Sequence, residues 1–324
     1  MKAAVLHQLG IAPKYEDFPD PVPQNDNQVL LSMKAASIKN LDKGRASGAH
    51  YAPHTKFPDV VGIDGVGVLP DGKRVYAMGI TGMIAEKALA DKNRLVPVPD
   101  GIDDVTAAAL PNAILGAALA LKYRAAMTPG KVVLVNGATG VTGKIAVQLA
   151  KYYGASRVIA TGRNAASLKH LTAELGADEA LSLSQEKNDF VSALKAIHTK
   201  TPIDIVIDYI WGTSVEWILH AVKGGGLNTP YHPIRIVTVG NMSGDNMDLG
   251  SAQLRSTAIE IVGSGFGSLP PEAFAKMNTE IIPELMKLAA GGGLHVETQS
   301  VPLTDVEKAW HSHVHPGARL VVTI

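Results

Sequence analysis

The stretch VVLVNGATGVTGKIAVQLAK, residues 132–151, decides the fold class. The apolar run 131–135 is typical of a buried strand, and a long amphipathic helix follows it. Between them stand Gly137, Gly140 and Gly143. Glycines at this spacing permit a tight turn, close approach of the backbone to a pyrophosphate, and close packing of helix on sheet. The free N–H groups at the helix start also favour a phosphate there. The stretch therefore predicts a dinucleotide-binding βαβ unit.

Strand and helix patterns alternate through the rest of the middle third. A helix is expected over 167–175, closed by Gly176. Strands alternating with helices are typical of a doubly wound parallel sheet, so an α/β fold is predicted. The further strands of this sheet are expected at 157–161, 204–210, 234–240 and 260–263.

The flanking thirds have a different pattern, and a chain of 324 residues suggests two domains. From 57 to 99, short Val-rich runs alternate with Gly, Pro and Asp, which indicates a small barrel or rolled sheet. Residues 104–123 predict an Ala/Leu-rich helix with a kink or break at Pro111. A helix over 271–290 and a last strand over 319–324, returning to the first domain, complete the expected fold.

The charge balance excludes several classes of partner. Lys plus Arg equals Asp plus Glu at 30 each, so no basic field favours nucleic acid or anionic lipid. No uninterrupted apolar run reaches the roughly 20 residues that a membrane span needs. We therefore expect a cytoplasmic protein that binds neither nucleic acid nor membrane. The absence of cysteine rules out disulfides, thiolate nucleophiles and Cys-ligated zinc.

The end of the second expected strand points to the kind of dinucleotide. NAD-binding folds usually carry Asp or Glu here, to accept hydrogen bonds from the ribose 2′-hydroxyl. This chain instead has Gly162, Arg163 and Asn164. An arginine can pair bidentately with a 2′-phosphate, so NADP(H) is predicted over NAD(H). The alternative is that Arg163 is a solvated surface charge.

Several segments together resemble one family. FPDVVGIDGVGVL, the stretch YAMGITGMIAEKALADKNRLVPVPDGI, AAALPNAILGAALAL, LGADEAL, IDIVIDYIWG and IVTVGNMSG follow in the order typical of the zinc-independent quinone oxidoreductase-like branch of the medium-chain dehydrogenase/reductase superfamily. The resemblance implies a GroES-like β-rich catalytic domain over 1–120 and 266–324. It also implies a Rossmann NADP(H)-binding domain over 121–265 and a homodimer that pairs through strand 260–263.

The resemblance also implies which residues contact the cofactor. The chain differs from the family pattern at two positions. Lys39 stands at the usual asparagine position of the active-site segment, with Asn40 one step later, and Gly116 replaces a frequent threonine. The positions that match the family's cofactor-binding segments are Gly137, Gly140, Val141, Thr142, Gly143, Gly162, Arg163, Asn164, Gly240, Asn241, Ser264, Gly265, Phe266 and Arg319.

Zinc members of the superfamily use a Cys and a "GHE" segment as catalytic ligands. Here the corresponding segment is Gly62, Ile63 and Asp64, and no Cys exists. Three alternating histidines near the C-terminus (His311, His313, His315) could suggest a metal. A polar surface turn before Pro316 and Gly317 is the favoured interpretation, so no metal is predicted.

The resemblance implies hydride transfer from NADPH to a small carbonyl-type substrate. Without a Lewis acid, acceptors that already delocalise charge are favoured, namely quinones or α,β-unsaturated carbonyls. The oxygen that develops charge needs a hydrogen-bond donor or a proton, and the candidates are Tyr51, Lys39 and Asn40. A quinone is the preferred acceptor. An enone, alkenal or enoyl reductase and a low-turnover NADPH-binding sensor remain alternatives.

Overall fold

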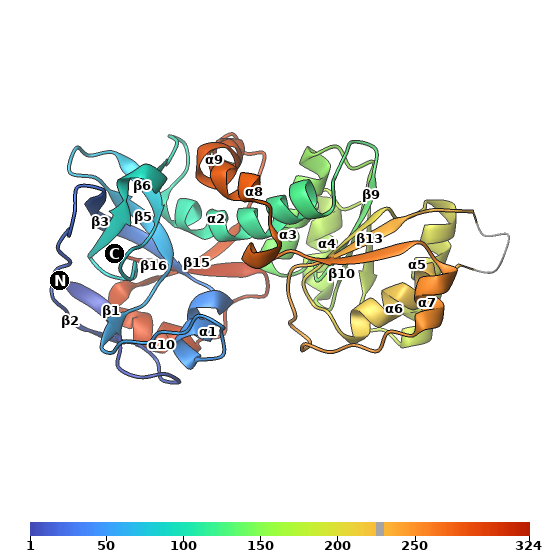
Figure 1. Ribbon diagram of the computed structural model, residues 1–324, viewed down its shortest axis with the longest axis horizontal. Helices are drawn as coiled ribbons and strands as arrows, with labels where there is room; N and C mark the ends of the chain where they lie inside the picture. Colours follow the sequence, from blue (N-terminus) through green and yellow to red (C-terminus); the bar gives the residue numbers. More distant parts are fainter. Residues whose placement is uncertain (225–229) are drawn as a thin grey trace. The chain divides into compact units, whose positions relative to one another are not determined.

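The computed structural model describes residues 1–224 and 230–324 of the chain (Figure 1). The chain folds into two compact units. The first unit contains residues 1–111 and 276–324, and the second contains residues 112–275.

The second unit is built on a parallel sheet of six strands in the order β11-β10-β9-β12-β13-β14. Every neighbouring pair in it is parallel, which confirms the predicted doubly wound sheet. The chain runs outward from β9 to one edge and then returns to the other side of β9, where β12 starts the second half. Its strands are β9 (Val132–Asn136), β10 (Arg157–Gly162), β11 (Glu179–Ser182), β12 (Ile205–Asp208), β13 (Ile234–Thr238) and β14 (Ile259–Gly263).

Helices cover this sheet and supply its core. Helices α5 and α6 lie side by side (Figure 1), and Phe190, Leu194 and Ile218 from them are fully buried against the central strands. Phe190 also meets Trp217, with ring centroids 5.6 Å apart. These contacts bury a continuous apolar face and so stabilise the sheet from one side. The helices are α3 (Val141–Tyr152), α4 (Ala165–Ala173), α5 (Lys187–Lys200), α6 (Thr213–Val222) and α7 (Ser251–Ser256).

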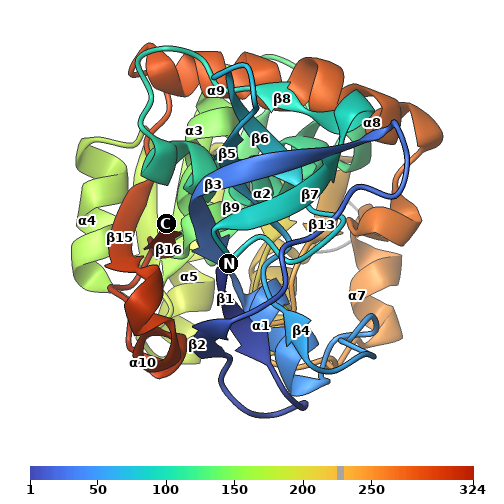
Figure 2. The same cartoon turned by 90° about the vertical axis from the view of Figure 1, so that its left-hand side faces the viewer.

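The first unit is β-rich and mainly antiparallel. A small sheet has the order β2-β1-β4, and a seven-stranded sheet has the order β15-β16-β3-β5-β6-β8 with β7 paired to β3 (Figure 2). Its strands are β1 (Lys2–Leu6), β2 (Lys14–Asp17), β3 (Gln28–Ile38), β4 (Asp59–Val60), β5 (Asp64–Val68), β6 (Arg74–Met78), β7 (Lys87–Asp91), β8 (Val96–Pro97), β15 (Glu297–Pro302) and β16 (Ala318–Thr323).

The last strand returns to the first unit, as the sequence predicts. β16 pairs antiparallel with β3, with Val321 opposite Ser37, and parallel with β15. Residues from β1, β3, β16 and the helix α10 share one buried cluster, which includes Leu6, Met33 and Trp310. The helices here are α1 (Asn40–Ser47), α9 (Ile282–Ala290) and α10 (Val306–His311). Helix α8 (Pro271–Lys276) and a π-helical turn (Met277–Ile281) precede α9.

Helix α2 (Asp104–Leu119) passes through Pro111 and continues as a π-helical turn (Ala120–Arg124). The helix therefore does not end at the proline. Its neighbours Leu110 and Ala113 are fully buried, and this packing offsets the hydrogen bond that a proline removes. Within the described residues, 104–124 is the one helix long and apolar enough to cross a membrane, with a mean hydropathy of 1.5. Because 72% of its apolar window is buried inside the protein, it has the character of a core helix.

Candidate functional site

The glycine-rich turn between β9 and α3, called the phosphate turn below, has close contacts that only glycine permits. Gly137 adopts a φ of +84°, and a Cβ there would lie 2.8 Å from Ile210 Cγ1. A Cβ on Gly143 would lie 2.3 Å from the Gly137 oxygen and 2.7 Å from Ala138 Cα. Gly140 precedes the first turn of α3, and no side chain caps that helix start. The turn therefore fits a pyrophosphate, with the N–H groups of Val141 and its neighbours as donors.

The segment after β10 lies directly against this turn. A Cβ on Gly162 would lie 2.4 Å from Thr139 Cγ2, so glycine is required for the two turns to touch. Arg163 follows with an exposed side chain. Asn164 caps helix α4, because its Oδ1 accepts a hydrogen bond from the Ser167 N–H at 2.8 Å. Arg163 is therefore an exposed arginine that directly follows the contact between the two turns.

The remaining cofactor candidates of the second unit gather at the same edge of the sheet. All six strands are parallel, so the turns that follow them lie along one carboxyl edge. Gly240 follows β13, and a Cβ there would meet the Tyr209 oxygen at 2.7 Å. Asn241 donates to Asp245, and Ser264 follows β14 with its N–H bonded to Thr238. Phe266 is half exposed, with its ring 5.8 Å from that of Phe274. Arg319 belongs to β16 of the first unit.

A buried carboxylate fixes the loop that follows β12. Asp208 is fully buried, and its Oδ1 accepts hydrogen bonds from Asn136 Nδ2 at 2.8 Å and Ile210 N at 3.0 Å. The Trp211 N–H lies 3.1 Å from both carboxylate oxygens. Burial raises the pKa of Asp208, and these hydrogen bonds act in the opposite direction. Trp211 has a φ of +65°, which a tryptophan adopts only when its surroundings enforce it. Asp208 therefore holds this loop in a strained shape.

We expect Asp208 to stabilise the fold because its oxygens accept hydrogen bonds, and we expect its charge to contribute less. Asp208→Ala leaves two loop N–H groups without an acceptor, and we expect a fall in Tm of about 5–10 °C. Asp208→Asn keeps a carbonyl oxygen where Oδ1 lies and should retain most of the stability. Differential scanning calorimetry of both variants measures the difference. Equal losses in the two variants would contradict a role for the oxygen.

The catalytic candidates lie in the first unit, on and near helix α1. Asn40 is the first residue of this helix and is exposed. Tyr51 lies in the loop beyond the helix, 84% exposed, with its ring 4.0 Å from that of His50. Both side chains are accessible enough to donate to a substrate oxygen. Lys39 differs, because it is 2% exposed.

The ammonium of Lys39 is fully engaged inside the first unit. It donates to the Ser37 oxygen at 2.9 Å, to Ser37 Oγ at 3.1 Å and to Asp64 Oδ1 at 2.5 Å. Asp42 Oδ2 lies 3.1 Å away. Burial acts to lower the pKa of Lys39, but the charges of Asp42 and Asp64 outweigh it and raise the pKa above its ordinary value. A lysine with this environment keeps its proton at neutral pH, so its position favours a fixed charge over a proton donor.

The same contacts decide whether the first unit could hold zinc. Asp64, in the segment that resembles the zinc-ligand "GHE", is already bonded to an ammonium, and its neighbour Ile63 has no donor atom. Across residues 1–224 and 230–324, no three His, Asp or Glu side chains group closely enough to hold a metal ion. The donor set therefore does not fit zinc.

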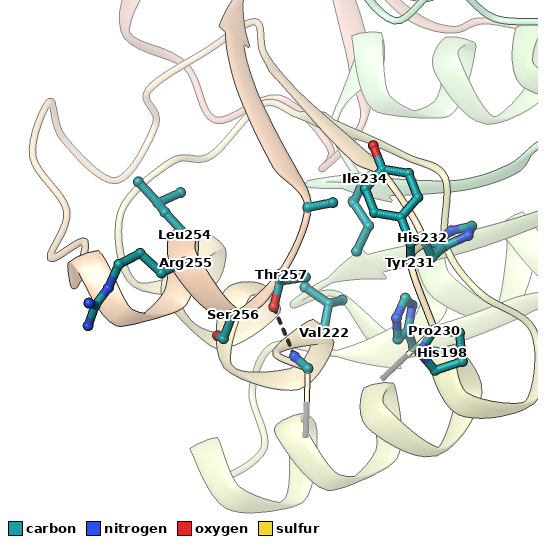
Figure 3. Close-up of a pocket in the computed structure, with 12 residues that line it drawn as sticks. His198, Val222, Pro230, Tyr231, His232, Ile234, Leu254, Arg255, Ser256 and Thr257 are labelled. Atoms are coloured by element: carbon teal, nitrogen blue, oxygen red, sulfur yellow. Dashed lines mark hydrogen bonds between the residues drawn. The ribbon is translucent and has the colours of Figure 1, made fainter. Parts of the chain in front are cut away.

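A separate cavity opens at the opposite, amino edge of the second unit's sheet. Its volume is about 390 Å³, and Ile234 at the start of β13 and Ala258 before β14 line it. Figure 3 shows His198 and His232 near one another on one side and Arg255 turned away from them. Burial, and then the neighbouring His232, lower the pKa of His198. Because it lies at the amino edge, this cavity is distinct from the cofactor candidates.

Two hydrogen-bond networks, around Lys39 and around Asp208, are not predicted from the sequence. The carboxylate partners of Lys39, Asp42 and Asp64, and the Tyr76 hydroxyl that donates to Asp64, come from three separate elements. Only the i, i+3 spacing of Lys39 and Asp42 is visible in the sequence. The Asp208 network includes Asn136 and Ser214, and a polar residue ending each of two buried strands is the signal that could have indicated it.

Comparisons with known proteins agree with this geometry. The family model described as "Zinc-binding dehydrogenase" matches residues 141–282. A probable NADPH-dependent quinone reductase of Emericella nidulans is 25% identical over 96% of this chain and 96% of its own length. The quinone oxidoreductase of Sus scrofa is 28% identical over 69% of this chain and 68% of its own. An NADPH-dependent alkenal/one oxidoreductase of Arabidopsis thaliana is 35% identical over 50% of this chain and 46% of its own.

Solved structures extend the likeness to the whole chain. The quinone oxidoreductase of Thermus thermophilus, described together with its NADPH complex, has a TM-score of 0.77 and 27% identity, and it covers 100% of both chains. A structure called AibC has a TM-score of 0.82 and 25% identity over 100% of this chain and 95% of its own. Both comparisons confirm the predicted combination of a Rossmann-like sheet with a β-rich domain. The chain is therefore similar to oxidoreductases of the medium-chain dehydrogenase/reductase superfamily, among them quinone oxidoreductases.

Proposed function

We propose that this protein is a zinc-free, NADPH-dependent oxidoreductase whose acceptor is a quinone. The observation that carries the proposal is the pairing of an uncapped glycine turn with an exposed Arg163 at the carboxyl edge of the sheet. The turn fits a pyrophosphate, and the arginine supplies a partner for a 2′-phosphate. The names of the relatives from Emericella nidulans and Sus scrofa support a quinone as acceptor.

When bound, NADPH would supply the hydride, and this chain's residues would hold it and manage the charge that develops on the acceptor. The turn Gly140–Gly143 would bind the pyrophosphate, and Gly162 to Asn164 would receive the adenosine side. The segments at Gly240–Asn241 and Ser264–Phe266, with Arg319, would meet the nicotinamide side. Tyr51 and Asn40, both exposed, would donate hydrogen bonds to the acceptor oxygen. Lys39, buried at the start of helix α1, would supply a fixed positive charge within the first unit.

We assign the two proposed functions, catalysis and cofactor binding, to the two domains expected from the resemblance. The catalytic domain would comprise 1–120 and 266–324, and the cofactor domain 121–265. We further propose a cytoplasmic homodimer, because β14 is an edge strand of its sheet and its residues 259 and 261–263 are only partly buried. Pairing of two such edges across a two-fold axis would continue the sheet. A monomer in static light scattering would remove this part of the proposal.

The direct test is oxidation of NADPH and of NADH against a benzoquinone, a naphthoquinone, an enal and an enoyl thioester. We expect NADPH to be used at least 10-fold faster than NADH, with a quinone as the best acceptor. Absorbance at the reduced nicotinamide band measures each rate. A chain that binds NADPH with high affinity but reduces none of the four acceptors would favour the low-turnover sensor.

An enone or alkenal is the second candidate acceptor. The alkenal/one oxidoreductase of Arabidopsis thaliana is 35% identical over half of this chain, which favours this alternative. An enal and a quinone both place developing negative charge on an oxygen, so the same donors serve both. If the enal is reduced at least 10-fold faster than either quinone, the enone assignment replaces the quinone assignment, and the cofactor assignment is unchanged.

A further inference from the structure

The ammonium of Lys39 lies inside a nest of four oxygen atoms. They are the carbonyl oxygen and Oγ of Ser37, at 2.9 and 3.1 Å, Asp64 Oδ1 at 2.5 Å and Asp42 Oδ2 at 3.1 Å. The residues that form the nest are buried, with exposed fractions of 0% for Ser37, 2% for Asp42 and 3% for Asp64. Buried oxygens that converge on one point are the arrangement by which proteins hold hard cations.

A second set of hydrogen bonds keeps the two carboxylates in place. Asp42 Oδ1 accepts from the Ile63 N–H at 3.0 Å, and Asp42 Oδ2 accepts from the Lys39 N–H at 2.9 Å. Asp64 Oδ2 accepts from the Tyr76 hydroxyl at 2.8 Å. Burial, and then the charges of Asp64 and Asp42, raise the pKa of Tyr76, so this hydroxyl remains a donor. Every carboxylate oxygen of Asp42 and Asp64 therefore has a hydrogen-bond donor.

The charges of this group balance only when Lys39 is present. Asp42 and Asp64 contribute two negative charges, and the nearby Arg319, 8% exposed, contributes one positive charge. Without the ammonium, one buried negative charge would have no counterion. A buried carboxylate that loses its counterion is strongly destabilising. The cation is therefore a requirement of the nest.

We propose that the side chain of Lys39 is the resident cation of the first unit, a tethered ion that occupies the position where an oxygen nest would otherwise hold a metal ion. It joins the end of β3 to helix α1 through Asp42 and to the start of β5 through Asp64. A tethered ammonium cannot dissociate, and chelators cannot remove it. This inference concerns the first unit alone and does not depend on the proposed reaction.

The proposal predicts that a shortened side chain opens the nest to an ion from solution. Lys39→Ala removes the ammonium and leaves both carboxylates, so the variant should bind one Mn²⁺ per chain, an ion that accepts carboxylate and carbonyl oxygens. The wild-type protein should bind none there. The Tm of Lys39→Ala should fall by about 10 °C and should recover at least half of that fall in millimolar MnCl₂ or methylammonium chloride.

A double-variant cycle tests whether Lys39 stabilises the first unit through its positive charge or through the volume of its side chain. Lys39→Met keeps the volume and loses the charge, so its Tm should fall nearly as far as that of Lys39→Ala. Lys39→Met combined with Asp64→Asn removes the surplus negative charge and should recover several degrees. Lys39→Arg, which keeps a cation, is the matched control for charge.

Calorimetric titration with MnCl₂ and thermal melts measure both sets of variants. The proposal is overturned if Lys39→Met melts with the wild-type protein, or if Lys39→Ala shows no more response to Mn²⁺ than the wild-type protein does. It is also overturned if the double variant is no more stable than Lys39→Met, including the case in which neither folds. Folding of the double variant when Lys39→Met fails to fold supports it.

Discussion

Gly143→Ala is expected to lower the affinity for NADPH more than 100-fold. The new Cβ would lie 2.3 Å from the Gly137 oxygen and 2.7 Å from Ala138 Cα, and both are backbone atoms that cannot rotate away. Relief of the clash requires a shift of the whole turn, and the loss of two charged hydrogen bonds to the pyrophosphate, at about 1.5–3 kcal/mol each, corresponds to more than 100-fold in affinity. Titration of the protein with NADPH by fluorescence measures the effect.

The neighbouring glycine provides the matched control for this substitution. A Cβ on Gly140 would have no contact closer than 3.7 Å, and φ at this residue is −79°. Gly140→Ala should therefore keep the Tm of the wild-type protein, whereas Gly143→Ala should melt several degrees lower. A Gly143→Ala variant that melts several degrees lower but keeps the wild-type affinity for NADPH would show that the turn does not hold the pyrophosphate.

Arg163→Ala is expected to reduce the affinity for NADPH 10- to 100-fold and to leave that for NADH unchanged. Arg163 is exposed and follows Gly162, which touches the glycine turn, so its guanidinium would pair with the 2′-phosphate that only NADPH carries. A charged hydrogen bond of this kind contributes about 1.5–3 kcal/mol, which corresponds to that range of affinity. Titrations with the two dinucleotides, at one ionic strength, give the ratio directly.

Lys169→Ala is the control for loss of a positive charge near this position. Lys169 is an exposed cation on helix α4, six residues after Arg163, and its removal should change neither affinity. If Arg163→Ala weakens NADPH and NADH equally, the arginine does not read the 2′-phosphate, and the predicted preference for NADP(H) is wrong.

The parallel sheet was predictable because its central strands, such as β9 and β12, are fully buried. Runs such as Val132–Val135 and Ile205–Ile207 are continuous and apolar, and glycines or helical patterns separate them. Strand β11 was less visible, because all four of its residues are only partly buried and its sequence has no apolar run. Helix α1 was missed for a similar reason. It buries only Asp42 and Ala46, so it has no apolar stripe to predict it.

The glycines of the candidate site were predictable because the backbone shape of the turn requires them. Gly137 and Gly143 are required by a positive φ and by contacts below 3 Å, and glycine alone satisfies such constraints. The role of Lys39 could not be predicted in the same way. Its partner Asp64 is 25 residues away, and Tyr76 comes from the following strand. Side chains that lie far apart in the sequence and meet only in the folded structure leave no periodic signal in the sequence.

The position of β16 has a consequence for how the chain folds during synthesis. This strand follows the whole second unit in the chain, yet it lies between β15 and β3 in the interior of the large sheet of the first unit. Residues 112–275 form a continuous segment and can assemble while the ribosome is still at work. β3 can pair with β5 and β7 early, but it gains β16 only after the residues of the second unit have been translated.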